Sequence, residues 1–128
     1  MKKHKPDWML LLKQGADEWN AFRKKNTDLV PDLAGQDLST AGLANYDLSN
    51  ALLDQANLAM AGLQNANLAN AALTRANLSR ADLEKAVLRN ADLSYANLYS
   101  AFLADTDLQG AKIEKANLFN AVTRLREE

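Results

Sequence analysis

Side chains that could perform catalysis are few in this 128-residue chain. It has one histidine, His4, in a basic leader, and no cysteine. Two carboxylate pairs stand two residues apart, Asp82 with Glu84 and Asp105 with Asp107. Catalytic carboxylates need opposed placement around a cleft, and the rod inferred below offers a convex surface instead. We therefore expect His4 to be a solvated surface residue and both pairs to be solvent-facing spacers.

Binding motifs for phosphate or metal do not occur either. Gly42, Gly62 and Gly110 are isolated, so they form no phosphate-binding loop. The calcium-binding glycine-aspartate nonapeptide of other β-helices is absent. The sequence therefore predicts a protein that is not an enzyme and that has no cofactor and no metal site.

A five-residue repeat sets the architecture. From Leu38 to Leu118 every fifth residue is a large aliphatic, sixteen leucines and Ile113, and Ala stands two residues earlier in fourteen of the seventeen cases. The exceptions are Gln36, Tyr46 and Thr106. Five residues rotate a helix by about 140° per step, and a strand alternates its side chains with period two. The leucines share one interior only if the chain turns a corner about every five residues, as in a solenoid.

A longer period appears in the outward positions. Asp37, Asn57, Asn77, Asn97 and Asn117 recur every twenty residues, and so do Asn50, Asn70 and Asn90. Coils of four five-residue sides would stack each set vertically at ~4.8 Å, where amides can hydrogen-bond up a ladder. Residues 36–120 then supply about four coils.

The repeat resembles the pentapeptide-repeat family, as in Ala76-Asn77-Leu78-Ser79-Arg80. The resemblance implies an all-β solenoid, a right-handed quadrilateral β-helix with the central Leu and the preceding Ala pointing inward. The predicted core accordingly includes Leu38, Leu58, Leu78, Leu98 and Leu118 with Ala56, Ala76 and Ala96. The segment before the repeats resembles the N-terminal cap of many bacterial members, particularly cyanobacterial ones.

The leading segment predicts an α-helical cap. Trp8, Leu11, Leu12, Trp19 and Phe22 follow helical spacing. Asp7 could cap the start of the helix, and Gly15 on the same stripe allows close approach or a break in two. We expect residues 1–30 to form the cap and linker, residues 31–122 the β-helix and residues 123–128 a tail. The alternative is an amphipathic helix that binds a membrane or a partner.

Aromatic residues gather near the other end of the predicted rod. Tyr99, Phe102 and Phe119 are outward repeat positions. In one interpretation Val122 and Leu125 fold over the end, and the aromatics are scattered surface residues. In the other they form a self-association surface for a C-terminal homodimer, which resembles the C-terminal dimer contacts of some family members.

Charge and hydropathy limit the classes of partner and the cellular location that we expect. Residues 1–35 carry seven basic and five acidic side chains, and residues 36–122 carry six and nine. Neither segment has the concentrated basic face expected for direct nucleic-acid binding. The apolar run from Trp8 to Leu12 is too short for a signal peptide or a membrane span, so we expect a cytoplasmic bacterial protein.

The sequence predicts a structural, protein-interaction module that presents flat β-helix faces to a protein partner. The partner itself is not identified by any motif. The alternative, implied by the family resemblance, is a DNA-mimicking modulator of DNA gyrase or topoisomerase. That role would require a long rod with a strongly negative surface.

Overall fold

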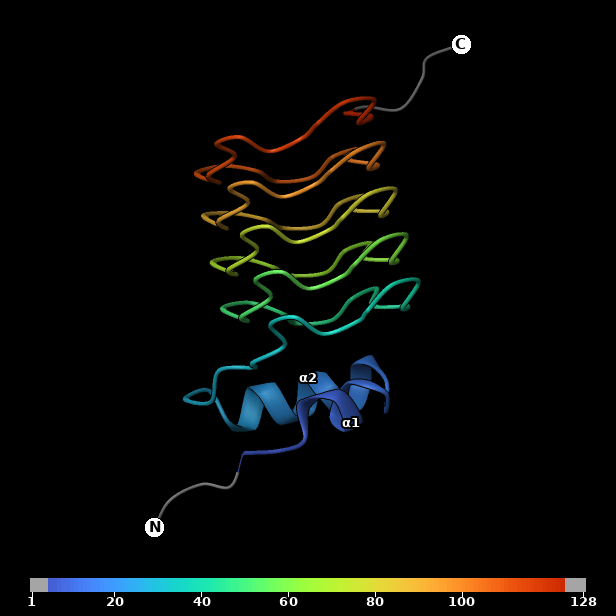
Figure 1. The fold of residues 1–128 in the computed structure, drawn as a ribbon. Coiled ribbons are helices and arrows are strands. Elements are labelled where there is room, and N and C mark those ends of the chain that lie inside the picture. Colours follow the sequence, from blue (N-terminus) through green and yellow to red (C-terminus); the bar gives the residue numbers. More distant parts are fainter. Residues whose placement is uncertain (1–4, 124–128) are drawn as a thin grey trace.

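The computed structural model describes residues 5–123 and shows two helices at one end of a stack of coils (Figure 1). Helix α1 spans Trp8–Leu12 and helix α2 spans Ala16–Lys25. From Asp32 to Val122, isolated parallel bridges pair residues twenty apart, such as Asp37 with Asn57. The bridges fall into four columns, and each side of a coil contributes one bridge rather than a longer strand. The predicted solenoid is confirmed, while its right-handed sense stays a prediction.

Backbone hydrogen bonds join each coil to the next with the same pattern on every side. In the central coils, Leu58 N–H donates to the Asn77 carbonyl at 2.7 Å, and Met60 N–H donates to that of Ser79 at 2.9 Å. One bond returns, from Asn77 N–H to the Ala56 carbonyl at 2.9 Å. On each side of a coil, two N–H donors and one carbonyl acceptor therefore point toward the next coil in the C-terminal direction. The two edges of a coil consequently differ in their balance of donors and acceptors.

The corners depend on left-handed backbone. Each turn is closed by a bond such as Ala61 N–H to the Leu58 carbonyl at 3.0 Å. The residue before the closing donor has φ between 55° and 69° at sixteen non-glycine positions. This explains the column of Asn50, Asn70 and Asn90, because asparagine enters this region more readily than most residues. Gly110, next in that column, has φ 76°.

The other asparagine column closes turns instead of forming the expected ladder. The side-chain oxygens of Asn57, Asn77, Asn97 and Asn117 each accept the N–H two residues later, at 3.0–3.1 Å. Within residues 5–123 this column has a single amide bond between coils, from Asn117 to Asn97 at 3.2 Å. The ladder expectation was wrong at the other steps, where the side-chain oxygen takes part in the local turn bond alone.

The core is a stack of leucines and alanines. Leu38, Leu58, Leu78 and Leu98 are buried, as are Ala56, Ala76 and Ala96. The expectation for Leu118 was wrong: 39% of this residue is exposed. Leu118 lies in the last coil, where no further described coil covers it. Burial of the repeat leucine therefore needs a neighbour on both sides.

Two of the three exceptions to the alanine pattern lie in terminal coils and make polar contacts there. Tyr46, in the first coil, donates its hydroxyl to the Leu12 carbonyl at 2.6 Å. Thr106, in the last coil, donates its hydroxyl to the Leu83 carbonyl at 2.7 Å. Each of these two side chains lies in a coil that has a described neighbouring coil on one side alone.

The helices pack their aromatic residues against the first coil. The Asp7 carboxylate accepts the Leu10 N–H at 3.1 Å, as the N-cap prediction requires, and Gly15 with φ 105° separates α1 from α2. The ring centroids of Trp8 and Trp19 are 5.6 Å apart, and those of Trp19 and Tyr46 are 6.0 Å apart. Among the predicted cap residues, Trp8, Leu12 and Trp19 are buried, while Leu11 and Phe22 are partly buried against the core.

Helix α2 also supplies hydrogen-bond partners to the exposed edge of the first coil. The Trp19 indole N–H and the Arg23 guanidinium both donate to the Asp47 carbonyl at 2.7 Å. Arg23 donates a second bond to the Ser49 carbonyl at 2.8 Å. Asn20 donates to the Asn45 carbonyl at 2.9 Å and accepts the Asp47 N–H at 2.8 Å. These side chains make the hydrogen bonds to the first coil that a preceding coil would otherwise make.

We predict that the alanine column tolerates no growth. Ala86 is 1% exposed between two coils, so Ala86→Leu should overpack the core and cost about 1–3 kcal/mol. The outward change Glu84→Leu, two residues away, should stay within about 0.5 kcal/mol. Urea unfolding of both variants measures the difference, and equal losses would contradict close packing at the alanine.

We predict an acid-sensitive turn at Asp37. Its pKa is lowered, first by the Ser39 hydroxyl, which donates at 2.7 Å, and then by the Ser39 N–H at 3.1 Å. A lowered folded-state pKa stabilises the fold above the unfolded value of about 3.9, and this contribution is lost as the pH falls through the folded value. Asp37→Asn keeps a side-chain oxygen that can accept hydrogen bonds from Ser39 but removes the negative charge.

The advantage of the wild type over Asp37→Asn should therefore shrink between pH 5 and pH 2. Urea unfolding across this range measures it, and the same comparison in a Ser39→Ala background should show a smaller change. A difference that does not vary with pH would contradict the assigned cause.

Candidate protein-interaction surfaces

One carboxylate of each pair with catalytic spacing, Asp82 and Asp107, makes contacts that hold the fold. One oxygen of Asp82 accepts the Glu84 N–H at 3.0 Å, and the other accepts the Gln64 amide at 2.8 Å. Asp107 accepts the Gln109 N–H at 3.0 Å and forms an ion pair with Arg89 at 2.9 Å. The Gln109 N–H and then Arg89 lower the pKa of Asp107. His4 lies outside the described residues.

Residues 5–123 contain no cluster of three or more histidine, cysteine or acidic side chains that could hold a metal. No helix in this part of the chain is long and apolar enough to cross a membrane. The solenoid interior is filled by leucine and alanine side chains, which leaves the described cavities at the helical end.

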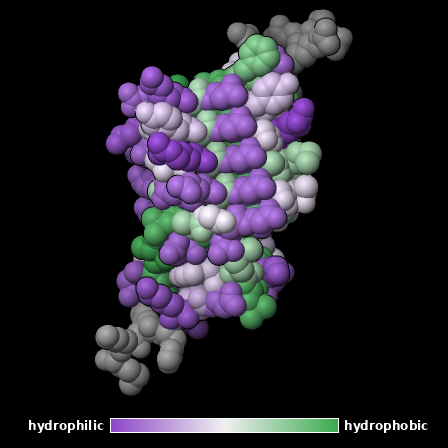
Figure 2. All heavy atoms as spheres, in the orientation of Figure 1, coloured by the Kyte–Doolittle hydropathy of each residue, from purple (hydrophilic) through white to green (hydrophobic). Residues whose placement is uncertain are grey.

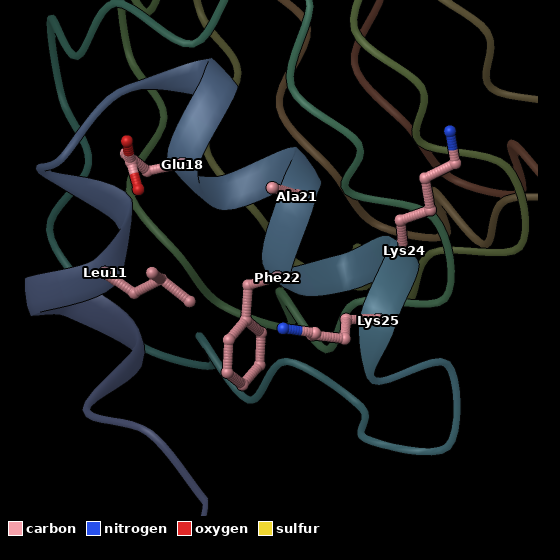
Figure 3. A pocket seen from close by; sticks show the side chains of 6 residues that line it. All are labelled: Leu11, Glu18, Ala21, Phe22, Lys24 and Lys25. Carbon is pink, nitrogen blue, oxygen red and sulfur yellow. The ribbon is translucent and has the colours of Figure 1, made fainter.

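Two hollows lie at that helical end. One, of about 490 Å³, lies on the outer side of α1 and α2, and Leu11 and Phe22 contribute its apolar lining (Figure 3). Glu18 and Lys25 line it as well, whereas the Lys24 side chain extends away from Phe22 (Figure 3). The second, of about 360 Å³, lies between α1 and the first coil. Neither brings together residues with a recognisable chemistry.

The side of the rod with the column from Asp37 to Asn117, here called the amide face, presents ordered polar groups. Figure 2 shows hydrophilic side chains stacked in a regular column along the coils. At the corner before this face, the Arg75 guanidinium lies 4.6 Å from the centroid of the Tyr95 ring. At the corner after it, the Arg80 guanidinium lies 5.3 Å from that of Tyr99. Arginine and tyrosine are both common anchors of protein interfaces.

The residues predicted for self-association are only partly brought together. Tyr99 and Phe119 stack at one corner, with ring centroids 6.1 Å apart and an interplanar angle of 16°. Phe102 lies on the adjacent side, where it bridges to Asp82 below and Val122 above. Within residues 5–123 it makes no ring contact with the other two aromatics.

The last coil exposes apolar residues that the prediction of a surface patch did not include. Exposed fractions are 48% for Ile113, 39% for Leu118 and 42% for Val122, beside 66% for Phe119. The signal was present in the sequence, since Thr123 interrupts the leucine series. Arg23 was also missed as a helix residue that contacts the coil, although it stands one helical turn after Trp19.

The edge of the last coil is rich in hydrogen-bond donors. On three of its sides, the N–H groups that would donate to a following coil have no backbone acceptor within residues 5–123, namely those of Leu108, Gly110, Ile113, Lys115, Leu118 and Asn120. The same three sides leave the carbonyls of Thr106, Ala111 and Ala116 without a backbone donor. This end therefore combines an apolar centre with a rim of N–H groups.

Comparisons with known proteins agree with the repeat and the coil. Residues 51–90 and 86–122 match the family model of pentapeptide repeats. A pentapeptide repeat protein of the Arabidopsis thaliana thylakoid lumen is 33% identical, with a TM-score of 0.70 over 76% of this chain and 70% of that protein. Among curated proteins, none matches the chain significantly.

Two cyanobacterial structures are also similar. HetL of Nostoc, a pentapeptide repeat protein involved in heterocyst differentiation regulation, is 42% identical with a TM-score of 0.66. The match covers 73% of this chain and 44% of HetL, so the chain spans less than half of that protein. Rfr23 of Cyanothece is 32% identical with a TM-score of 0.50, over 74% of this chain and 63% of that protein. On the family model, these structures and its own twenty-residue coils, the chain belongs to the pentapeptide-repeat family.

Proposed function

We propose that this chain is a non-enzymatic protein-interaction module that binds partners through the sides and the C-terminal end of a rigid rod. The observation that carries the proposal is the uncovered last coil, where four large apolar residues are 39–66% exposed. Contiguous exposed apolar surface of this kind marks interaction sites in soluble proteins. The similarity to HetL, a protein involved in regulation, supports a role through binding.

The alternative of duplex DNA mimicry has less support. It requires a strongly negative rod, whereas residues 36–122 carry six basic side chains against nine acidic ones. Arg75 and Arg80 are exposed on one flank of the rod. A cytoplasmic location stays a prediction, and one similar structure is a protein of the thylakoid lumen.

A second copy of the chain is the partner that we propose for the C-terminal end. Two-fold pairing would bury both apolar centres at once and close the assembly. Backbone hydrogen bonds alone cannot hold this pair together, because both of the edges that meet have more N–H donors than carbonyl acceptors. The contact must therefore be carried by the side chains of Ile113, Leu118, Phe119 and Val122, with the N–H rim left to water or side-chain oxygens.

We predict a concentration-dependent dimer that depends on these residues. Phe119→Asp/Val122→Asp should place charges in the contact and give a monomer, because buried unpaired carboxylates are costly. Met60→Asp, at a residue 56% exposed in a coil far from this end, is the matched control and should stay dimeric. Sedimentation equilibrium at high micromolar concentration measures all three, and a monomeric wild type would refute the dimer.

At the other end, we propose that α1 and α2 act as a cap that protects the first coil from pairing with other chains. An open β edge is a template for aggregation. The side chains of Trp19, Asn20 and Arg23 bond to carbonyls of this edge at 2.7–2.9 Å. The cap role then rests on polar groups as much as on the aromatic packing.

We predict that removing the Arg23 donors weakens the cap. Arg23→Met keeps much of the length but leaves the Ser49 carbonyl without its donor and the Asp47 carbonyl with the Trp19 indole alone, which should cost about 1–3 kcal/mol. The exposed neighbour Lys24 makes no such bond, so Lys24→Met should stay within about 0.5 kcal/mol. Urea unfolding compares the two variants. Equal effects would show that the guanidinium contacts do not hold the cap in place.

A further inference from the structure

Two arginines on the amide face are held in position by aromatic rings. Arg75 lies over Tyr95 and Arg80 over Tyr99, each ring belonging to the next coil, at 4.6 and 5.3 Å. Both distances are within the range of cation–π attraction. Stacking fixes the guanidinium plane and leaves its N–H groups directed outward around the edge. The side chains thus lose less freedom when a ligand binds than free surface arginines would.

The donors of these two arginines have no acceptor in the part of the chain that the structure describes. Within residues 5–123, neither guanidinium takes part in an ion pair or a side-chain hydrogen bond. The other arginines of this region differ, since Arg89 is paired with Asp107 at 2.9 Å and Arg23 donates to coil carbonyls. Arg75 and Arg80 are therefore ordered cations that remain available to a ligand.

The asparagines between them add donors of the same kind. The side-chain oxygens of Asn77 and Asn97 are bonded to turn N–H groups at 3.0 Å, which leaves both amide NH₂ groups without an acceptor in the described chain. Residues 74–80 and 94–100, which form this part of the face, contain two arginines and no acidic residue. The surface thus presents positive charge and hydrogen-bond donors but few acceptors.

We infer that the amide face binds an extended acidic segment of a partner protein, whose carboxylates are received by Arg75 and Arg80 and whose remaining oxygens accept from Asn77 and Asn97. The inference rests on the proposed interaction role. The arginines stand at the two corners of one side of the coil, five residues apart in sequence, a separation that a few residues of extended peptide at about 3.3 Å each can span. Carboxylates two to four residues apart therefore fit the pair. Nucleic acid fits less well, because the rod as a whole carries more acidic than basic residues.

Poly-L-glutamate is a suitable probe, with poly-L-lysine and single-stranded oligo-dT as comparison ligands. Fluorescence anisotropy at low salt should show tighter binding of poly-L-glutamate than of either comparison ligand. In NMR spectra of the labelled protein, the largest shifts should occur in the Arg75 and Arg80 side-chain N–H signals and in the Asn77 and Asn97 amides. Tighter binding of oligo-dT, or shifts spread over all basic residues, would overturn the inference.

Variants distinguish a specific binding site from non-specific electrostatic attraction. Arg75→Gln/Arg80→Gln should weaken binding at least about tenfold, because two charge-assisted contacts are lost. Arg89→Gln removes one cation that is already paired, and should change the dissociation constant by less than about twofold. Tyr95→Leu/Tyr99→Leu removes no charge, yet should weaken binding severalfold if the stacking orders the arginines. Circular dichroism confirms folding of each variant.

These binding measurements test the acidic-partner site separately from the proposed C-terminal dimer. Loss of poly-L-glutamate binding in Arg75→Gln/Arg80→Gln with an intact dimer supports the acidic-partner site. Equal weakening by Arg89→Gln, or no effect of the tyrosine changes, refutes it and leaves the dimer proposal untouched.

Discussion

Backbone hydrogen bonds between successive coils are the interaction on which every other feature of this protein depends. A twenty-residue coil has no ladder of its own, and each side contributes only one bridge to its neighbour. The bonds between coils are short and regular, 2.7–3.0 Å in the central coils. They fix which residues point inward, and so they bring leucines that are twenty residues apart in sequence into one core. A coil without a neighbour lacks both its bonds and its burial, as the exposure of Leu118 shows.

The corners oppose this stabilisation. Sixteen non-glycine residues adopt positive φ, a conformation that costs roughly 1 kcal/mol for most L-residues. Aspartate or asparagine at the strand centre offsets part of the cost, because its oxygen accepts the N–H two residues later, as Asn77 does for Ser79 at 3.0 Å. Residues as different as Met60, Arg80 and Tyr95 can then occupy the left-handed position. The outward corner columns are consequently free to vary and can carry binding groups.

The inward register could be predicted from the sequence because it depends on one rule, a leucine every fifth residue and an alanine two before it. The helical segment could be predicted as well, down to the Asp7 cap and the interruption at Gly15. Local hydrogen bonding was harder to foresee: Asn57 and Asn77 recur at twenty-residue spacing whether their amides form a ladder or close a turn. The pairing of arginines with rings was not foreseen, although the predicted twenty-residue coil already places Arg75 and Tyr95 at the same corner of successive coils.

The docking of α2 onto residues 45–49 bears on how the chain acquires its shape during synthesis. The helices precede the coils in the sequence, and the Asn20 and Arg23 contacts need only the first fifty residues. A ribosome therefore releases a template before any later coil exists, and each following twenty-residue stretch finds an edge already formed. Folding can advance in the order of translation, one coil at a time, with a low penalty for loop closure at each step. The contact order of the whole rod then matters less than that of a single coil.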